Sequence, residues 1–376
     1  MAAGVCANAQ DTFEAKYEAG IKANPTGVGV MLRATSGRTS FHLYETIPIT
    51  LEFTNTGVSH YSIEMDEEMN AAGQSNRFYV SDPENANFTS QQVFNGAVVC
   101  CDSEKRFLSR QPVKFNRELT DYIRFKKPGT YKVFYVTNRV FRGMGKPEDF
   151  KPSKLSLTSN QLTLTILPDE DEWNSRQLSA TLSRLRDPDL KKKYIAATRR
   201  AKAARSGIAS DYVNTNIVSQ TEYVLAQKAL NALDTEEAIE QRVAMMNMES
   251  EADLDSARKY GGGTILPQPL FASTTRPDLL IAAMEKRASD PDFGIDYDYA
   301  ELWTHLLVQR EHPETFRPFF EEGERGSKIH DYLTHYRDAE ESVLASLEKL
   351  APTKRGEGKE ITELTIKTRK KNRSDK

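Results

Sequence analysis

The six histidines have the widest choice of chemistry in this chain, because imidazole serves both as a general acid or base and as a metal ligand. Their spacing limits that choice. His330 and His335 are five residues apart, and on a helix this spacing turns the two side chains roughly 140° away from each other. His305 and His312 lie two helical turns apart, about 10 Å along the axis. The spacing predicts separate histidines on helices, with no shared metal ion.

Other reactive groups also lack the spacing that a known type of site requires. Cys100 and Cys101 are adjacent, so a disulfide between them is strained, and no second cysteine pair completes a zinc site. The acidic runs Asp66-Glu67-Glu68 and Asp296-Tyr297-Asp298 lack the loop pattern of a calcium site. Gly261-Gly262-Gly263 does not lead directly into a helix, which favours a hinge over a phosphate-binding loop. We predict no catalytic residue, no cofactor and no metal.

Positive charge marks one candidate binding surface. Lys191, Lys192, Lys193, Arg199 and Arg200 make the helix expected after Asp187-Pro188 strongly basic. Such a helix suits an acidic protein partner or an anionic lipid surface, and a solvated helix face explains the same charges. A second candidate is an aromatic group, interpreted as helix-packing core with a peptide groove as the alternative: Tyr297, Tyr299, Trp303, Phe316, Phe319 and Phe320.

The elements that position these groups change type at Pro168. Before it, apolar residues alternate with polar ones, as in Ile47, Ile49, Leu51 and Phe53, and this period of two is typical of half-buried strands. Further strands are expected over 119–125, 131–138 and 162–167, and around 97–101. Turn residues separate these runs without helical patterns between them. The sequence therefore predicts an antiparallel β-sandwich over 28–168.

After Pro168 the apolar spacing becomes helical. Leu178, Leu182 and Leu185 form one stripe, and similar stripes recur up to Leu350. Asp187-Pro188-Asp189 and Asp290-Pro291-Asp292 each resemble the corner between two helices, where Asp caps the second helix and Pro fits its first turn. We expect an all-helical domain over 169–352, followed by a basic, disordered tail over 353–376.

Length and charge bound the remaining choices. A chain of 376 residues suits two domains, and its net charge of −3 favours neither nucleic acid nor a membrane surface. No apolar run is long enough to span a bilayer. Residues 1–27 are interpreted as a flexible leader. It contains Ala7-Asn8-Ala9, a small-residue pattern that a signal peptidase accepts, so export to the periplasm or the cell exterior is favoured over a cytoplasmic location.

Two features carry a family resemblance. Phe41-His42-Leu43-Tyr44 leading into Ile47-Pro48-Ile49, with Pro128-Gly129-Thr130-Tyr131 further on, resembles bacterial immunoglobulin-like domains of the cell-adhesion-related and proteinase-inhibitor-like kind. The Asp-Pro-Asp corners resemble the turns of HEAT-type repeats. As a whole, the chain resembles uncharacterised exported bacterial proteins that join these two parts. The resemblance implies a fold, β then α, and no activity.

These observations favour a non-enzymatic interaction or scaffold protein with a protein partner. One alternative is a proteinase inhibitor that uses a loop of the sandwich within 69–95. A second alternative is a hydrolase that uses a histidine and carboxylates of the helical half.

Overall fold

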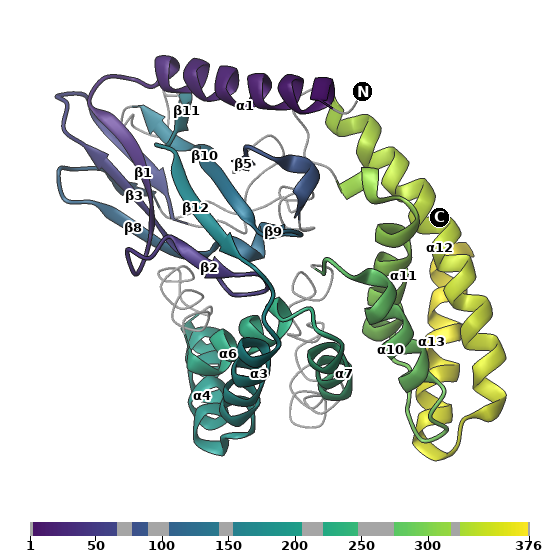
Figure 1. Cartoon of the computed structure of the whole chain (residues 1–376). Coiled ribbons are helices and arrows are strands. Elements are labelled where there is room, and N and C mark those ends of the chain that lie inside the picture. Colours follow the sequence, from purple (N-terminus) through teal and green to yellow (C-terminus); the bar gives the residue numbers. More distant parts are fainter. Residues whose placement is uncertain are drawn as a thin grey trace, which may run out of the picture. The chain divides into compact units, whose positions relative to one another are not determined.

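After an N-terminal helix, which the sequence did not predict, the chain consists of strands followed by helices, as the change of spacing at Pro168 predicted (Figure 1). A computed structural model describes residues 3–65, 77–88, 105–142, 153–204, 221–246, 274–316 and 324–374. The chain divides into two compact units, Met1–Ala232 and Leu233–Lys376. The first unit contains the strands together with the helices up to Ala232, so the compact units divide later than the boundary expected at Pro168. Among the helices described, none is both long and apolar enough to cross a membrane.

A three-stranded antiparallel sheet forms one part of the first unit. It consists of β1 (Val28–Ala34), β3 (Pro48–Asn55) and β8 (Val113–Glu118), with β3 in the centre. Leu51 lies opposite Leu32 on one side and opposite Phe115 on the other. Ile49, Leu51 and Phe53 are all buried, which confirms the alternation predicted for this strand.

A larger sheet is organised around one long strand, β10 (Gly129–Arg142). Its first part pairs with β12 (Leu162–Leu167) and β5 (Arg77–Val80), and its last part pairs with β11 (Ser153–Thr158) and β4 (Tyr61–Glu64). The remaining strands are β2 (Ser40–His42), parallel to β12, and β7 (Lys105–Phe107), antiparallel to β4.

The segment 119–125 differs from the continuous strand that its sequence predicted. A 3₁₀ turn, η2 (Leu119–Asp121), precedes the short strand β9 (Ile123–Phe125), which pairs with β6 (Ala86–Phe88). The turn forms because the amide of Leu119 donates to the carbonyl of Ile47 and the amide of Tyr122 donates back to Leu119. Both Leu119 and Ile123 become buried in this arrangement.

The expected flexible leader contains a helix, α1 (Ala3–Ala23), that packs on the larger sheet (Figure 1). Phe13 is 5% exposed, and its ring lies 4.9 Å from that of Phe134 on β10. The carboxylate of Glu14 accepts from Lys132 and Gln161 at 2.7 and 2.8 Å. The Ala-rich composition suggested a flexible terminus, but Phe13 and Glu14 bind this helix to the sheet through specific contacts.

Two asparagine side chains bind the main chain of strands. Asn24, just after α1, donates to the carbonyl of Thr158 at 2.7 Å and accepts from its amide at 2.8 Å. Asn160 accepts from the amide of Leu32 at 2.8 Å and donates to its carbonyl at 3.1 Å. Close to the first pair, a Cβ atom at Gly20 would lie 2.3 Å from the hydroxyl of Thr158, so this approach of α1 to β11 requires glycine.

Helices α3 (Asp171–Arg186), α4 (Pro188–Ala204) and α6 (Glu222–Ala232) complete the first unit. The Asp187-Pro188 corner forms as predicted, because the carboxylate of Asp187 accepts from the amide of Asp189 at 2.8 Å. Helix α6 is attached to the strand region by an ion pair of 2.6 Å between Lys228 and Asp121. A hydrogen bond from Arg124 to the carbonyl of Asn231 reinforces this contact.

The second unit is helical. A fully buried carboxylate, Asp234, lies at its beginning and accepts from Arg242, Thr274 and Thr275. The helical elements of this unit are α7 (Glu236–Met245), α10 (Pro277–Ala288), α11 (Tyr297–Glu311), η3 (Pro313–Phe316), α12 (Glu324–Leu350), η4 (Ala351–Thr353) and α13 (Gly356–Ser374).

The second Asp-Pro-Asp segment does not start a helix, so this prediction is wrong. After α10 the chain stays irregular until Asp296, whose carboxylate caps α11 by accepting from the amide of Tyr299 at 2.8 Å. The delay lets Phe293 and Ile295 enter the core. This segment is thus a connection with its own buried residues, and the capping residue is Asp296 in place of the expected Asp290.

Helix α13 replaces the disordered tail that composition predicted. Its buried residues Gly358, Thr362, Thr365 and Arg369 follow helical spacing, but all four are polar or small. A Cβ atom at Gly358 would lie 2.8 Å from the carbonyl oxygen of Asp292, so the helix approaches the backbone closely there. A buried stripe without large apolar residues escapes a search for hydrophobic periodicity.

Some expectations concern parts of the chain outside the described residues. They are the strand around Cys100 and Cys101, the acidic run 66–68 and the glycine hinge 261–263.

The carboxyl group of Glu118 generates a prediction on the pH dependence of stability. Burial, opposed by the charge of Lys228, raises the pKa of Glu118 from 4.5 to about 7. A raised folded-state pKa costs no stability well below pH 4.5, and the cost grows between pH 4.5 and about 7 and stays constant above that. Since one pKa unit corresponds to about 1.4 kcal/mol, Glu118→Gln should stabilise the chain by up to about 3 kcal/mol above neutral pH. Urea unfolding at acidic and alkaline pH measures the difference.

The matched control is Glu172→Gln, because the side chain of Glu172 is 87% exposed. This change should alter the free energy of unfolding by less than about 0.5 kcal/mol at either pH. A gain for Glu118→Gln that is equal at both pH values would contradict the role given to ionisation.

Candidate metal-binding site

The basic residues singled out from the sequence lie in one helix, α4, and three of them are consecutive lysines. Lys191 is half-buried, Lys192 and Lys193 are exposed, and Lys192 pairs with Asp189 at 3.5 Å. Consecutive helical residues are turned by about 100° from each other, so the three ammonium groups point in different directions. Arg199 and Arg200 lie in the same helix, and their side chains are outside the described part of the chain.

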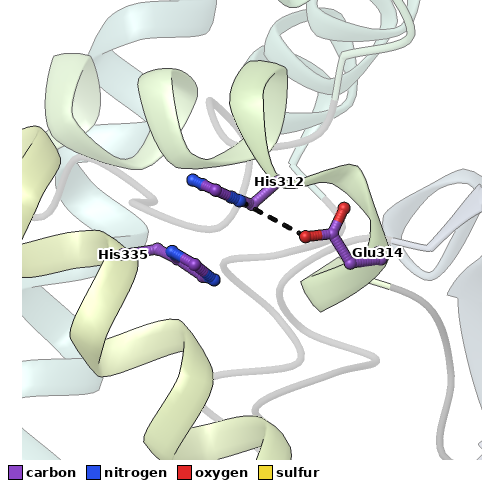
Figure 2. A group of neighbouring side chains, drawn as sticks. All are labelled: His312, Glu314 and His335. Atoms are coloured by element: carbon purple, nitrogen blue, oxygen red, sulfur yellow. Dashed lines mark hydrogen bonds and ion pairs between the residues drawn. The ribbon is translucent and has the colours of Figure 1, made fainter.

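Of the six histidines, His312 and His335 come together with a carboxylate (Figure 2). His312 is the residue after α11, Glu314 lies in η3, and His335 lies within α12. One potential ligand atom from each of the three residues lies within 4.8 Å of the others. Of the other four histidines, His42 stacks on Trp173, His305 contacts Tyr332, and His60 and His330 are exposed.

The geometry of the group is specific. His312 Nδ1 and Glu314 Oε1 are 3.3 Å apart, within an ion pair if the imidazole is protonated. The rings of His312 and His335 are stacked, with their centroids 3.5 Å apart and their planes at 12°. His312 and His335 are half-buried and Glu314 is exposed, so solvent reaches the group.

Sequence reasoning missed this group because it compared histidines along single helices. His330, the other histidine of α12, is exposed and is not one of the three residues of this group. His312 instead meets His335 across the contact between α11 and α12. The available signal was His312-Pro313-Glu314 at a helix end, where proline stops α11 and sets a carboxylate beside an imidazole. That signal is weak without knowledge of the helix pairing.

A polar network holds α11 against α12. His305 Nε2 lies 3.5 Å from Glu301 Oε1, and His305 Nδ1 is hydrogen-bonded to the hydroxyl of Tyr332. The hydroxyl of Tyr336 also bonds to Glu301. Burial raises the pKa of Glu301, but hydrogen bonds from His305 and Tyr336 and the charge of Arg369 outweigh it and lower the pKa. Tyr332 and Tyr336 flank His335, so this network positions its helix.

Arg369 of α13 is the central cation of this network. Its side chain is 0% exposed and pairs with Glu301 at 2.8 Å and Glu340 at 3.4 Å. The guanidinium also lies over the ring of Tyr297, 4.9 Å from its centroid. Helices α11, α12 and α13 are therefore linked through one buried charge.

Arg369→Met should destabilise the second unit by about 3–5 kcal/mol, because it leaves Glu301 and Glu340 without their cation. Urea unfolding followed by the fluorescence of Trp303 measures this in a Trp173→Phe background, since the chain has 2 tryptophans. Adding Glu301→Gln and Glu340→Gln to Arg369→Met should recover part of the loss.

Arg373→Met serves as control, because the partner of Arg373, Glu341, is 58% exposed. An exposed pair contributes up to about 1 kcal/mol. Equal losses for Arg369→Met and Arg373→Met would show that burial of the network is unimportant.

Comparisons with known proteins add no family to these observations. No family model matches the chain, and no curated protein matches it significantly. The role of the histidine group therefore rests on its own geometry.

Proposed function

We propose that this protein is a non-enzymatic binding protein whose helical unit holds a divalent transition-metal ion at His312, Glu314 and His335. The carrying observation is the convergence of three potential ligand atoms within 4.8 Å. Around a tetrahedral zinc ion, ligand atoms lie about 3.3 Å apart, given zinc–ligand distances of about 2.0–2.2 Å. Rotation of the three side chains can bring their ligand atoms from the observed separations, up to 4.8 Å, to those around a zinc ion, because the ligand atoms lie far out on the side chains.

The ligand types favour one class of ion. Imidazole nitrogen suits Zn²⁺, Cu²⁺ and Ni²⁺, whereas Mg²⁺ and Ca²⁺ prefer sets of oxygen ligands. Two imidazoles with one carboxylate also form a set that zinc enzymes use, with water in the fourth position. The hydrolase alternative would thus use these same residues, and turnover of a substrate would distinguish it from binding alone.

Zinc titration of the full chain by calorimetry tests the proposal. His335→Ala should weaken binding at least on the order of 100-fold, because even indirect partners of metal ligands contribute roughly 10–100-fold to affinity. His330→Ala is the matched control, since His330 is an exposed histidine of the same helix. Absence of zinc binding by the unmodified chain, or equal losses in both variants, would exclude the site.

A second proposal concerns an acidic protein partner at α4. Lys191, Lys192 and Lys193 lie in the first turns of this helix, where the positive end of the helix dipole disfavours cations. The helix dipole therefore does not favour lysine at the start of α4, and an acidic partner gives this run of three lysines a role. Export and an interaction or scaffold role belong to the same proposal, supported by Ala7-Asn8-Ala9 and by this basic helix.

Reversing Lys191, Lys192 and Lys193 to glutamate should abolish binding of a fluorescent polyglutamate peptide, measured by anisotropy. The reversal of Arg176, Arg184 and Arg186, exposed residues of α3, changes the net charge equally and should leave most of the binding. If the two triple variants lose binding of the peptide to a similar extent, net charge alone explains the effect and the proposed surface on α4 is wrong.

The finer fold assignments are proposals as well. An immunoglobulin-like sandwich is supported by contacts of β1 with β11 and β12, which bring the two sheets together. A HEAT-like repeat is supported by the α3–α4 hairpin with its Asp187 cap. The inhibitor alternative depends on 69–95, of which 77–88 is described and contains β5, η1 (Pro83–Asn85) and β6.

A further inference from the structure

The stacked arrangement of His312 and His335 is incompatible with a shared metal ion. An imidazole nitrogen binds a metal along its lone pair, which lies in the plane of the ring. The two ring planes differ by only 12° and their centroids are 3.5 Å apart. Lone pairs in nearly parallel planes at this separation do not meet at one point about 2 Å from both nitrogens. Figure 2 shows the rings face to face, with Glu314 beside His312.

We propose that this stack is the ion-free form of the site, and that an ion enters when the side chain of His335 rotates out of the stack. This inference rests on the function proposed above and adds how the site is regulated. His312 is held by its contact with Glu314 at 3.3 Å. For His335, the described ring contact is the stack itself. Rotation of His335 therefore gives up one aromatic contact and leaves the imidazole–carboxylate pair in place.

The same geometry leaves one position of the ion open to a ligand from outside the chain. The described group supplies three ligands, and a tetrahedral ion takes four. The Glu314 side chain is 60% exposed and that of His312 is 33% exposed, so the open position faces solvent. Water or a small carboxylate fits this position. A site of this kind exchanges its ion and its external ligand more readily than a closed four-ligand site.

The experiment uses the full chain, with imidazole signals observed by NMR. In the ion-free protein, the ring protons of His312 and His335 should show the upfield shifts that a stacked neighbour causes. Added Zn²⁺ should remove these shifts for both rings. Added Co²⁺ should give the d–d absorption of a tetrahedral complex, and acetate should change that spectrum by occupying the open position.

His335→Phe provides the decisive variant, because it keeps an aromatic ring on His312 and removes a ligand. It should retain the upfield shift of His312 and lose zinc binding, whereas His335→Ala should lose both. If the unmodified chain binds zinc while the ring shifts persist, the stack is not the ion-free form, although the metal site stands. If acetate leaves the cobalt spectrum unchanged, the inference of an open coordination position is wrong. A chain that binds no zinc at all removes the proposed function itself.

Discussion

A guanidinium group buried away from water must be neutralised where it lies, because solvation no longer offsets its charge. Arg369 meets this constraint with Glu301 on α11 and Glu340 on α12. The requirement fixes three helices with respect to one another, since each carries one member of the network. His335 lies in one of these helices, α12, and His312 directly follows another, α11. The site thus inherits its geometry from an electrostatic requirement several residues away, rather than from contacts among its own ligands.

The same principle explains why the first unit extends beyond its strands. Helix α6 contributes Lys228 to Asp121, a pair whose side chains are 14% and 13% exposed. In addition, the main-chain carbonyl of Asn231 in α6 accepts a hydrogen bond of 2.6 Å from the guanidinium of Arg124. If α6 moved away from the strands, these half-buried polar groups would lose their partners, which costs free energy. The helices up to Ala232 therefore belong with the sheets, although the sequence changes its period at Pro168.

Local patterns predicted what depends on local rules. Alternation in Ile49, Leu51 and Phe53 indicated a strand, and the cap at Asp187 indicated a helix start, because both signals act within a few residues. The histidine group depends on which helices pair, and no spacing along one helix contains that information. Helix α13 was missed for another reason: its buried face consists of Gly358, Thr362, Thr365 and Arg369, which composition counts as solvated. Its apolar partners lie elsewhere in the chain.

The side-chain amides of Asn24 and Asn160 bind main-chain groups at two strand edges of the first unit, and strand edges are where extended chains associate. An unpaired strand edge offers its N–H and C=O groups to any other extended chain. β1 ends the three-stranded sheet, and β11 pairs with β10 among the described strands. Each asparagine occupies both main-chain groups of one residue, Thr158 or Leu32, as a neighbouring strand would. At these two residues the strand edges have no free main-chain groups to offer to another extended chain.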